Sequence, residues 1–324
     1  MDRDDLALFE RSLGHATDGR SGDELDAALV ELGWPDALET DRRAAVSLLF
    51  SLQGRAAATS GALDHLLATG LAIGSDATTP LDLGVVLPAI DRWDPPGVAD
   101  GRTLRVRGIG SATLAGRATA LVVATSGPST VLAAVPTASL TLRPVTGVDP
   151  WMGLHEITAD DIELGEDPTV LGGEWTAVVA AAHLALAHEL VGTARTMLEL
   201  ARRHALDRVQ FDQPIARFQA VRHRLAETLV AIEMAEAVID AAWLDGTNET
   251  AAMAKAVAGR EARIASKHCQ QVLAGIGFTT EHELHRSIRR ALVLDALFGT
   301  ATSLTAAAGA DLLARRRLPP LLPL

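Results

Sequence analysis

Four long helical segments rich in alanine and leucine occupy the second half of the chain, and they constrain its fold more than any other feature. The apolar stripe of the first segment consists of Leu190, Ala194, Met197, Leu198 and Ala201. The same periodicity predicts helices over about 174–206, 217–245, 250–273 and 283–315, the last interrupted near Gly299. Helices of this length with short connections are typical of an up-and-down four-helix bundle.

The first half of the chain consists of two segments that differ in composition and hydrophobic pattern. Residues 1 to about 73 carry leucine and alanine at helical spacing, and turn residues at Gly33–Pro35 and Ser60–Gly61 break them into several short helices. From Asp82 to about Glu163 the chain is rich in Val, Thr, Gly and Pro. Short β-like runs lie at 85–87, 104–107, 118–124, 131–135 and 140–145. Their close spacing favours a small antiparallel barrel or sandwich over parallel crossover units.

These patterns predict an α+β chain of three domains. We expect an N-terminal helical domain over 1–74, a central β domain over 75–165 and a C-terminal helical bundle over 166–324. A chain of 324 residues is long enough for such a division, because single cores stop growing at roughly 250–300 residues.

Composition excludes several function classes. The 41 acidic residues outnumber the 29 lysines and arginines, so a nucleic-acid or membrane partner is disfavoured. The single cysteine, Cys269, excludes an intramolecular disulfide and fits a reducing compartment. The longest apolar run, 175–187, contains a threonine and a histidine and is shorter than the ~20 residues that cross a bilayer. We therefore expect a soluble, cytoplasmic protein.

Isolated motifs add little chemistry. His282 and His285 are three residues apart, whereas a zinc helix of the H-E-x-x-H type needs four, so ordinary polar contacts are expected and no metal site. Cys269 falls within a predicted helix, which favours a buried, inert thiol over a nucleophile. His183, on an alanine-rich helix, is expected to be a core histidine.

Two longer segments are more specific. Residues 203–227, RHALDRVQFDQPIARFQAVRHRLAE, resemble the segment R-x-Q-F-G-x-P-I-x-x-F-Q-A-x-x-x-x-L-A of flavin-dependent acyl-CoA dehydrogenases. Residues 271–290, QVLAGIGFTTEHELHRSIRR, resemble that family's Q-x-x-G-G-x-G-[FY]-T-x-E-[HY] segment and the arginine-rich helix after it. The order of helices, β domain and bundle agrees independently. The resemblance is strong over about 172–317 and weak before it.

The resemblance implies a FAD cofactor that lies between the β domain of one subunit and the bundle of its partner. Carried over residue by residue, the cofactor-binding positions are Arg208, Phe211, Gln219, Gln271 and Gly275. A guanidinium suits a pyrophosphate, a phenyl ring can pack on a planar ring, and glycine permits close backbone approach. The alternative is that Phe211 and Gln219 only fix the turn between two helices.

The departures from the family pattern concern the catalytic base. Most members carry a glutamate directly before Gly-Thr, where this chain has Phe298, and a minority carry it on the first bundle helix, at the position of Ala182. Neither residue accepts a proton, so no catalytic residue is assigned. A miscount by one residue or one turn would bring His183 or Glu189 into question.

Other departures affect the cofactor site. The family's T-E-P-x-x-G-S-D signature in the β domain has no counterpart, and the nearest fragment is 75–80. Within the motifs, Asp212 and Ala274 stand where the family has glycine. Such a pattern resembles the short, base-lacking subunit of actinobacterial α2β2 acyl-CoA dehydrogenases, in which a full-length partner supplies the base and most of the FAD site. Those assemblies commonly oxidise steroid-derived CoA thioesters.

The resulting expectation is a subunit of a FAD-dependent acyl-CoA dehydrogenase that makes an α,β-unsaturated acyl-CoA together with a full-length partner. Two alternatives remain open: a self-sufficient homo-oligomeric dehydrogenase with a displaced base, and a non-catalytic oligomerisation or interaction protein. In each case the alanine-rich bundle predicts an oligomer, because helices covered in small residues pack closely on both faces.

Overall fold

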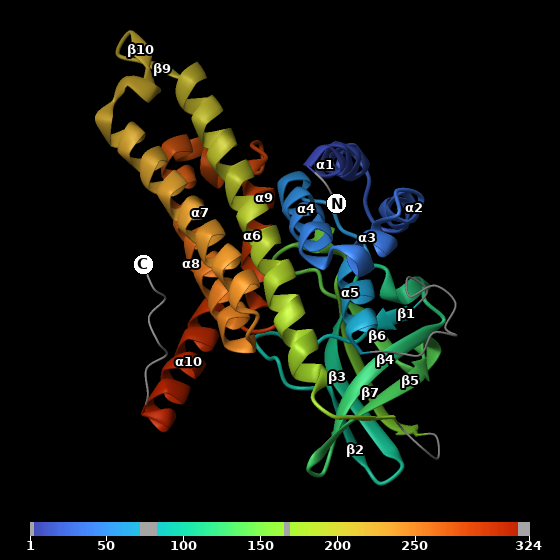
Figure 1. Ribbon diagram of the computed structural model, residues 1–324. Helices are drawn as coiled ribbons and strands as arrows, with labels where there is room; N and C mark the ends of the chain where they lie inside the picture. Colours follow the sequence, from blue (N-terminus) through green and yellow to red (C-terminus); the bar gives the residue numbers. More distant parts are fainter. Residues whose placement is uncertain (1–2, 72–82, 165–168, 317–324) are drawn as a thin grey trace.

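The computed structural model describes residues 3–71, 83–164 and 169–316 (Figure 1). Its N-terminal helices are α1 (Arg3–Thr17), α2 (Asp23–Glu31), α3 (Trp34–Thr40), α4 (Arg42–Ala56) and α5 (Ala62–Gly70). The expected breaks are present: Gly33 precedes α3 in the left-handed region (φ 70°), and Ser60–Gly61 precedes α5. Asp41 caps α4, since its carboxylate accepts a hydrogen bond from Ala44 N at 3.1 Å.

The central part is one mixed sheet. Its strands are β1 (Leu83–Val85), β2 (Gly97–Asp100), β3 (Thr103–Gly110), β4 (Thr119–Ser126), β5 (Ser129–Pro136), β6 (Thr141–Pro144), β7 (His155–Glu163) and β8 (Thr169–Leu171). The order is β6-β7-β3-β2-β4-β5-β8, with β1 beside β4. Most ladders are antiparallel, as the spacing indicates, but β1 and β2 both pair with β4 in parallel.

The sheet extends beyond residue 165, where the sequence places the start of the bundle domain. β8 pairs with β5 through Thr130↔Leu171 and two further residue pairs. The start of α6 follows within three residues of this strand. The bundle is therefore joined directly to the edge of the sheet.

The C-terminal part is the expected helical bundle. Its elements are α6 (Glu174–Asp207), β9 (Val209–Gln210), β10 (Gln213–Pro214), the short helix η5 (Ile215–Arg217), α7 (Gln219–Asp245), α8 (Asn248–Leu273), η6 (Ala274–Phe278), α9 (Leu284–Ala296) and α10 (Ala301–Arg315). The interruption near Gly299 is confirmed: Phe298 (φ 54°) and Gly299 (φ 94°) both lie in the left-handed region. In Figure 1, α10 leaves the bundle at the end opposite to β9 and β10.

Close backbone contact joins the N-terminal helices to the bundle. A Cβ on Gly54 of α4 would lie 2.1 Å from Glu189 O of α6, and a Cβ on Gly192 of α6 would lie 2.1 Å from Ser51 O of α4. Glycine at both positions lets the helix axes approach more closely than side chains would allow. The crossing of α4 and α6 thus positions the N-terminal part over the bundle.

Two helical stretches, Glu174–Asp207 and Leu284–Arg315, have the length and hydropathy of membrane spans. Of the apolar window in the first, 83% is buried inside the fold, as expected for the core helix of a bundle. The corresponding share is 44% for the second, which includes the break before α10.

Candidate functional site

The two motif segments meet at one end of the bundle. α6 ends beside the loop after η6, where the rings of His204 and His282 are 6.4 Å apart. The start of α7 lies against the end of α8, and Thr228 Oγ1 is 3.3 Å from His268 Nδ1. The exposed residues of 203–227 and 271–282, which are separated in sequence, therefore lie together at one end, here called the bundle end.

A tight hairpin projects from the bundle end (Figure 1). β9 and β10 pair through Gln210↔Gln213, so the loop between them has two residues, Phe211 and Asp212. Both are left-handed, with φ of 53° and 62°, which is the geometry of a type I′ turn. The Phe211 side chain is 86% exposed and contacts Phe218 edge to face, with ring centroids 6.1 Å apart.

All five predicted cofactor-binding residues lie at the bundle end. Arg208 caps the C-terminus of α6, Gln219 begins α7, and Gln271 lies in the last turn of α8; all three are exposed. Among the described residues, none of these three side chains has a hydrogen-bonding or ionic partner. A Cβ on Gly275 would meet nothing within 4 Å. The structure thus gathers these residues on an exposed surface.

The positions considered for a base lie elsewhere, inside the protein. Phe298 and Ala182 are 1% and 0% exposed. His183 Nε2 lies 2.9 Å from Phe298 O, so this nitrogen donates and Nδ1 carries no proton. Burial lowers the pKa of His183 to about 4, which makes the imidazole a weak base at neutral pH.

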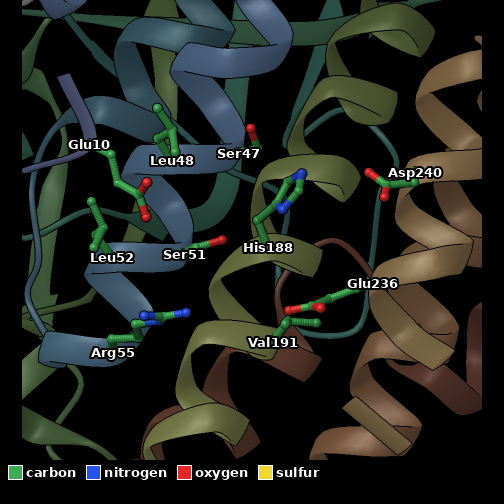
Figure 2. A pocket seen from close by; sticks show the side chains of 10 residues that line it. All are labelled: Glu10, Ser47, Leu48, Ser51, Leu52, Arg55, His188, Val191, Glu236 and Asp240. Carbon is green, nitrogen blue, oxygen red and sulfur yellow. The ribbon is translucent and has the colours of Figure 1, made fainter. Parts of the chain in front are cut away.

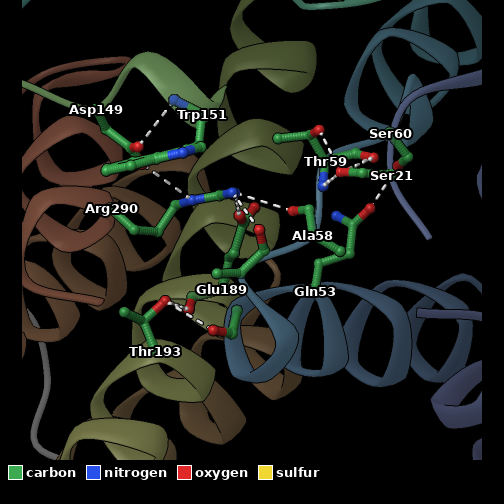
Figure 3. Close-up of polar contacts among 12 residues, drawn as sticks. Ser21, Gln53, Ala58, Thr59, Ser60, Asp149, Trp151, Glu189, Thr193 and Arg290 are labelled. Carbon is green, nitrogen blue, oxygen red and sulfur yellow. Dashed lines mark hydrogen bonds and ion pairs between the residues drawn. The ribbon is translucent and has the colours of Figure 1, made fainter. Parts of the chain in front are cut away.

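The carboxylate of Glu189 is held in a buried ion pair with Arg290. Arg290 Nη1 donates to Glu189 Oε1 at 3.0 Å, and the same guanidinium donates to Ala58 O at 2.9 Å and Ala57 O at 2.6 Å (Figure 3). Arg290 Nε lies 3.4 Å from Asp149 Oδ2. Burial raises the pKa of Glu189, and the charge of Arg290 opposes that shift. The pair ties the bundle to the end of α4 and to the β domain.

This ion network crosses the junction where the three parts of the chain meet. The cavity left there has a volume of only about 50 Å³, and its walls include Phe50, Met152, Leu186, Leu294 and Arg290. Such a space holds one or two water molecules, at ~30 Å³ each. A fatty or steroid acyl group does not fit in it. Sequence reasoning missed this role of Arg290, although the arginine-rich helix that carries it was part of the second motif.

No metal site is evident in the described ranges, where no group of three or more His, Cys, Asp or Glu side chains is placed to hold an ion. His282 Nδ1 accepts from Leu284 N at 3.1 Å, and His285 Nδ1 lies 2.8 Å from His282 O, so both bind their own loop. Cys269 is buried, and burial raises the pKa of its thiol to about 12. The fragment 75–80 lies outside the described residues.

Comparison with known proteins agrees with this architecture. Residues 177–313 match the family of acyl-CoA dehydrogenase C-terminal domains. This match covers the helical bundle from α6 to α10. The acyl-CoA dehydrogenase IpdE2 of Mycobacterium tuberculosis is 34% identical over 150 residues, which cover 46% of this chain and 45% of that relative. The match thus spans less than half of the relative's length.

Solved structures share the fold over nearly the whole chain. The match to a chain of the ChsE4-ChsE5 complex from Mycobacterium tuberculosis has a TM-score of 0.80 at 19% identity. It covers 98% of this chain and 98% of the matched chain. The Tcur3481-Tcur3483 steroid ACAD has a TM-score of 0.77 at 21% identity and covers 97% of this chain and 98% of its own. At these identities the likeness concerns the fold alone.

Proposed function

We propose that the chain is the non-catalytic subunit of a FAD-dependent acyl-CoA dehydrogenase and that its bundle end contacts a FAD held mainly by a full-length partner. One contrast supports this. Arg208, Gln219 and Gln271 are exposed at the bundle end and have no polar partner among the described residues, while the interdomain junction is occupied by the Arg290 network. This contrast favours a chain that contacts a cofactor held by a partner and does not bind a substrate at its own interdomain junction.

The residues at the bundle end fit this role chemically. In the assembly, FAD would accept the hydride from the β-carbon of the acyl-CoA while a carboxylate of the partner removes the α-proton. Arg208 would bind a pyrophosphate oxygen pair with its planar guanidinium. Phe211 would cover a ring face, Gln219 and Gln271 would hydrogen-bond polar edges, and Gly275 would allow close approach of the backbone.

Names of similar proteins support the substrate class and the partner. One structural neighbour is named as a steroid ACAD, and another is a complex of two chains, ChsE4 and ChsE5. By analogy, the proposed reaction is α,β-desaturation of a steroid-derived acyl-CoA by a cytoplasmic hetero-oligomer. The partner would also supply the base, because Phe298 and Ala182 carry no carboxylate and Glu189 is paired with Arg290.

The first test is the visible spectrum of the chain purified alone and co-purified with a candidate full-length partner. We expect flavin absorption near ~450 nm only in the complex. Stoichiometric FAD on the isolated chain would contradict the proposal and favour a self-sufficient enzyme. If the chain is self-sufficient, substitution of its base, His183 or Glu189, should abolish turnover while the bound flavin is retained.

A matched pair of variants tests the bundle end directly. Arg208→Gln removes the guanidinium of the arginine that the motif specifies, and Arg217→Gln removes an exposed guanidinium nine residues later, at a position that the motif leaves unspecified. We expect Arg208→Gln to reduce the FAD affinity of the complex about tenfold, the value of one charge-assisted hydrogen bond. Arg217→Gln should leave it unchanged. Equal flavin content in the complex of Arg208→Gln would instead favour a non-catalytic interaction protein.

A further inference from the structure

A second cavity lies between the N-terminal helices and the bundle, and it shares no residue with the interdomain junction. It has a volume of about 250 Å³ and is bounded by α1, α4, α6 and α7 (Figure 2). None of the five residues of the cofactor motifs lines it. The family resemblance therefore assigns no role to this cavity. The side chains that line it determine which ligand it fits.

His188, which lines the cavity, has a hydrogen-bond donor without a partner among the described residues. Trp243 Nε1 donates to His188 Nε2 at 3.0 Å. An indole N–H only donates, so His188 accepts at Nε2 and carries its proton on Nδ1. Burial lowers the pKa of His188 to about 4, which keeps the ring neutral. Nδ1–H has no partner within the described part of the chain, and the Ser51 hydroxyl points toward the same space (Figure 2).

The charges around the cavity divide into paired and unpaired groups. The two carboxylates from α7 are paired: Arg195 Nε donates to Glu236 Oε1 at 2.7 Å, and Arg43 Nη2 donates to Asp240 Oδ1 at 2.7 Å.

Two lining residues lack such partners. Arg55 of α4 and Glu10 of α1 are exposed, and neither side chain has an oppositely charged group within 4.0 Å among the described residues. One free positive charge and one free negative charge thus face the same space. This arrangement complements a ligand that carries both charges, whereas a simple anion or cation would meet one repulsive group.

The remaining wall is apolar, with the side chains of Leu48, Leu52 and Val191. A volume of about 250 Å³ lies just below the 300–1,000 Å³ range that is typical of drug-sized ligands. It suits a molecule of about ten heavy atoms with a short aliphatic chain.

We propose that this cavity binds a small aliphatic zwitterion of the free α-amino acid class, of about the size of leucine. Its carboxylate would receive hydrogen bonds from Arg55, Ser51 and the Nδ1–H of His188. Its ammonium group would face Glu10, and its side chain would pack on Leu48 and Leu52. The site is independent of the flavin and of the reaction proposed above.

Calorimetric titration of the full-length chain, or of its complex, with L-leucine tests the proposal. Two analogues separate the charges: 4-methylpentanoate keeps the carboxylate and 3-methylbutylamine keeps the amine. We expect saturable binding of leucine and at least tenfold weaker binding of either analogue. No saturable leucine binding up to about 10 mM would overturn the proposal, since that corresponds to less than ~3 kcal/mol. Equal affinity for 4-methylpentanoate would overturn the zwitterion assignment.

Matched variants locate the site. Arg55→Gln and Glu10→Gln should each weaken leucine binding about tenfold, while Arg42→Gln, an exposed arginine at the start of α4 outside the cavity, should leave it unchanged. Flavin content of the complex should be the same in all three, so failure here is distinct from failure of the proposed dehydrogenase role. Unchanged leucine affinity in Arg55→Gln would show that any binding occurs elsewhere.

Discussion

At the scale of single residues, the ion pair between Arg290 and Glu189 is the most consequential. Both side chains are almost fully buried, so neither charge is solvated by water. Arg290→Met leaves Glu189 without a counter-charge, and we expect it to lower the free energy of unfolding by about 3–5 kcal/mol. Urea denaturation measures this loss.

A double variant distinguishes loss of the pair from loss of packing. Arg290→Met with Glu189→Met removes both charges, so we expect it to be less destabilised than Arg290→Met alone. Arg224→Met, on an exposed arginine of α7, should change stability by less than ~0.5 kcal/mol. Additive losses in the double variant would mean that the charges do not interact and that the network is held by packing.

Asp64 makes the free energy of unfolding depend on pH. Its carboxyl group is buried beneath the β domain, where Ser111 Oγ donates to Oδ2 at 2.6 Å and Oδ1 has no partner in the described part. Burial raises the pKa of Asp64 from 3.8 to about 7. The folded state therefore holds a proton that the unfolded state releases between about pH 4 and 7, and this group's stabilisation is lost as pH rises through about 7.

The variant Asp64→Asn isolates that contribution. An amide does not titrate, so the stability of the variant relative to the wild type should increase from pH 4 to pH 8, by up to about 4 kcal/mol. A constant offset from the unpaired amide leaves the slope unchanged. Equilibrium unfolding at four or five pH values measures the difference, and a flat difference would show that Asp64 titrates alike in both states.

At the scale of elements, helices follow from the sequence better than strands do. The stripe of Leu190, Ala194 and Met197 predicts α6, since each side chain recurs on one buried face. β7 was not predicted, because its sequence HEITADDIE carries four acidic residues and buries only Ile157 and Ala159. Its strand conformation depends on ladders with β3 and β6, which are pairings that a local pattern does not contain.

The candidate site divides in the same way. The cofactor motifs are local segments of the chain, so their residues could be named from the sequence, and their position at one end follows from antiparallel packing of α6, α7 and α8. The Arg290 network joins residues 101 and 232 positions apart, and no sequence pattern marks such contacts. The same holds for Arg55, Glu10 and His188, which line one cavity because α1 packs on α4 and α4 crosses α6.

The β9–β10 hairpin permits a test at this scale. Asp212 has φ 62°, a conformation that glycine adopts without steric cost. Asp212→Gly should therefore stabilise the chain by up to about 1 kcal/mol, part of the gain being offset by the greater entropy of unfolded glycine. Ala226→Gly, at an exposed helical position of α7, should instead destabilise it by about 1 kcal/mol. Thermal unfolding compares the two, and equal losses would mean that the turn is not strained.

At the scale of the whole molecule, one face of α7 is not covered by any of the residues that the structure describes. Only six of the 27 residues of this helix are buried. Val230, Met234 and Leu244 are 66%, 40% and 80% exposed, and their spacing places them on one side of the helix. Glu233 borders this stripe on the side of Leu244, and it pairs with Arg195 of α6, as does Glu236 further round the helix. An apolar stripe of this kind on a bundle helix is typical of a contact with a second subunit.

Val230→Lys tests whether this stripe is the assembly surface. The lysine points to solvent in the isolated chain, so folding should be unaffected, but in the assembly it would bury a charge without a partner. We expect the affinity for the partner subunit, or for a second copy, to fall at least tenfold. Val98→Lys, at a comparably exposed position of β2, serves as the control. Sedimentation velocity measures the oligomeric state of both variants. An unchanged oligomer in Val230→Lys would show that the interface lies on another face. The next candidate is α10, whose Leu313 is 79% exposed.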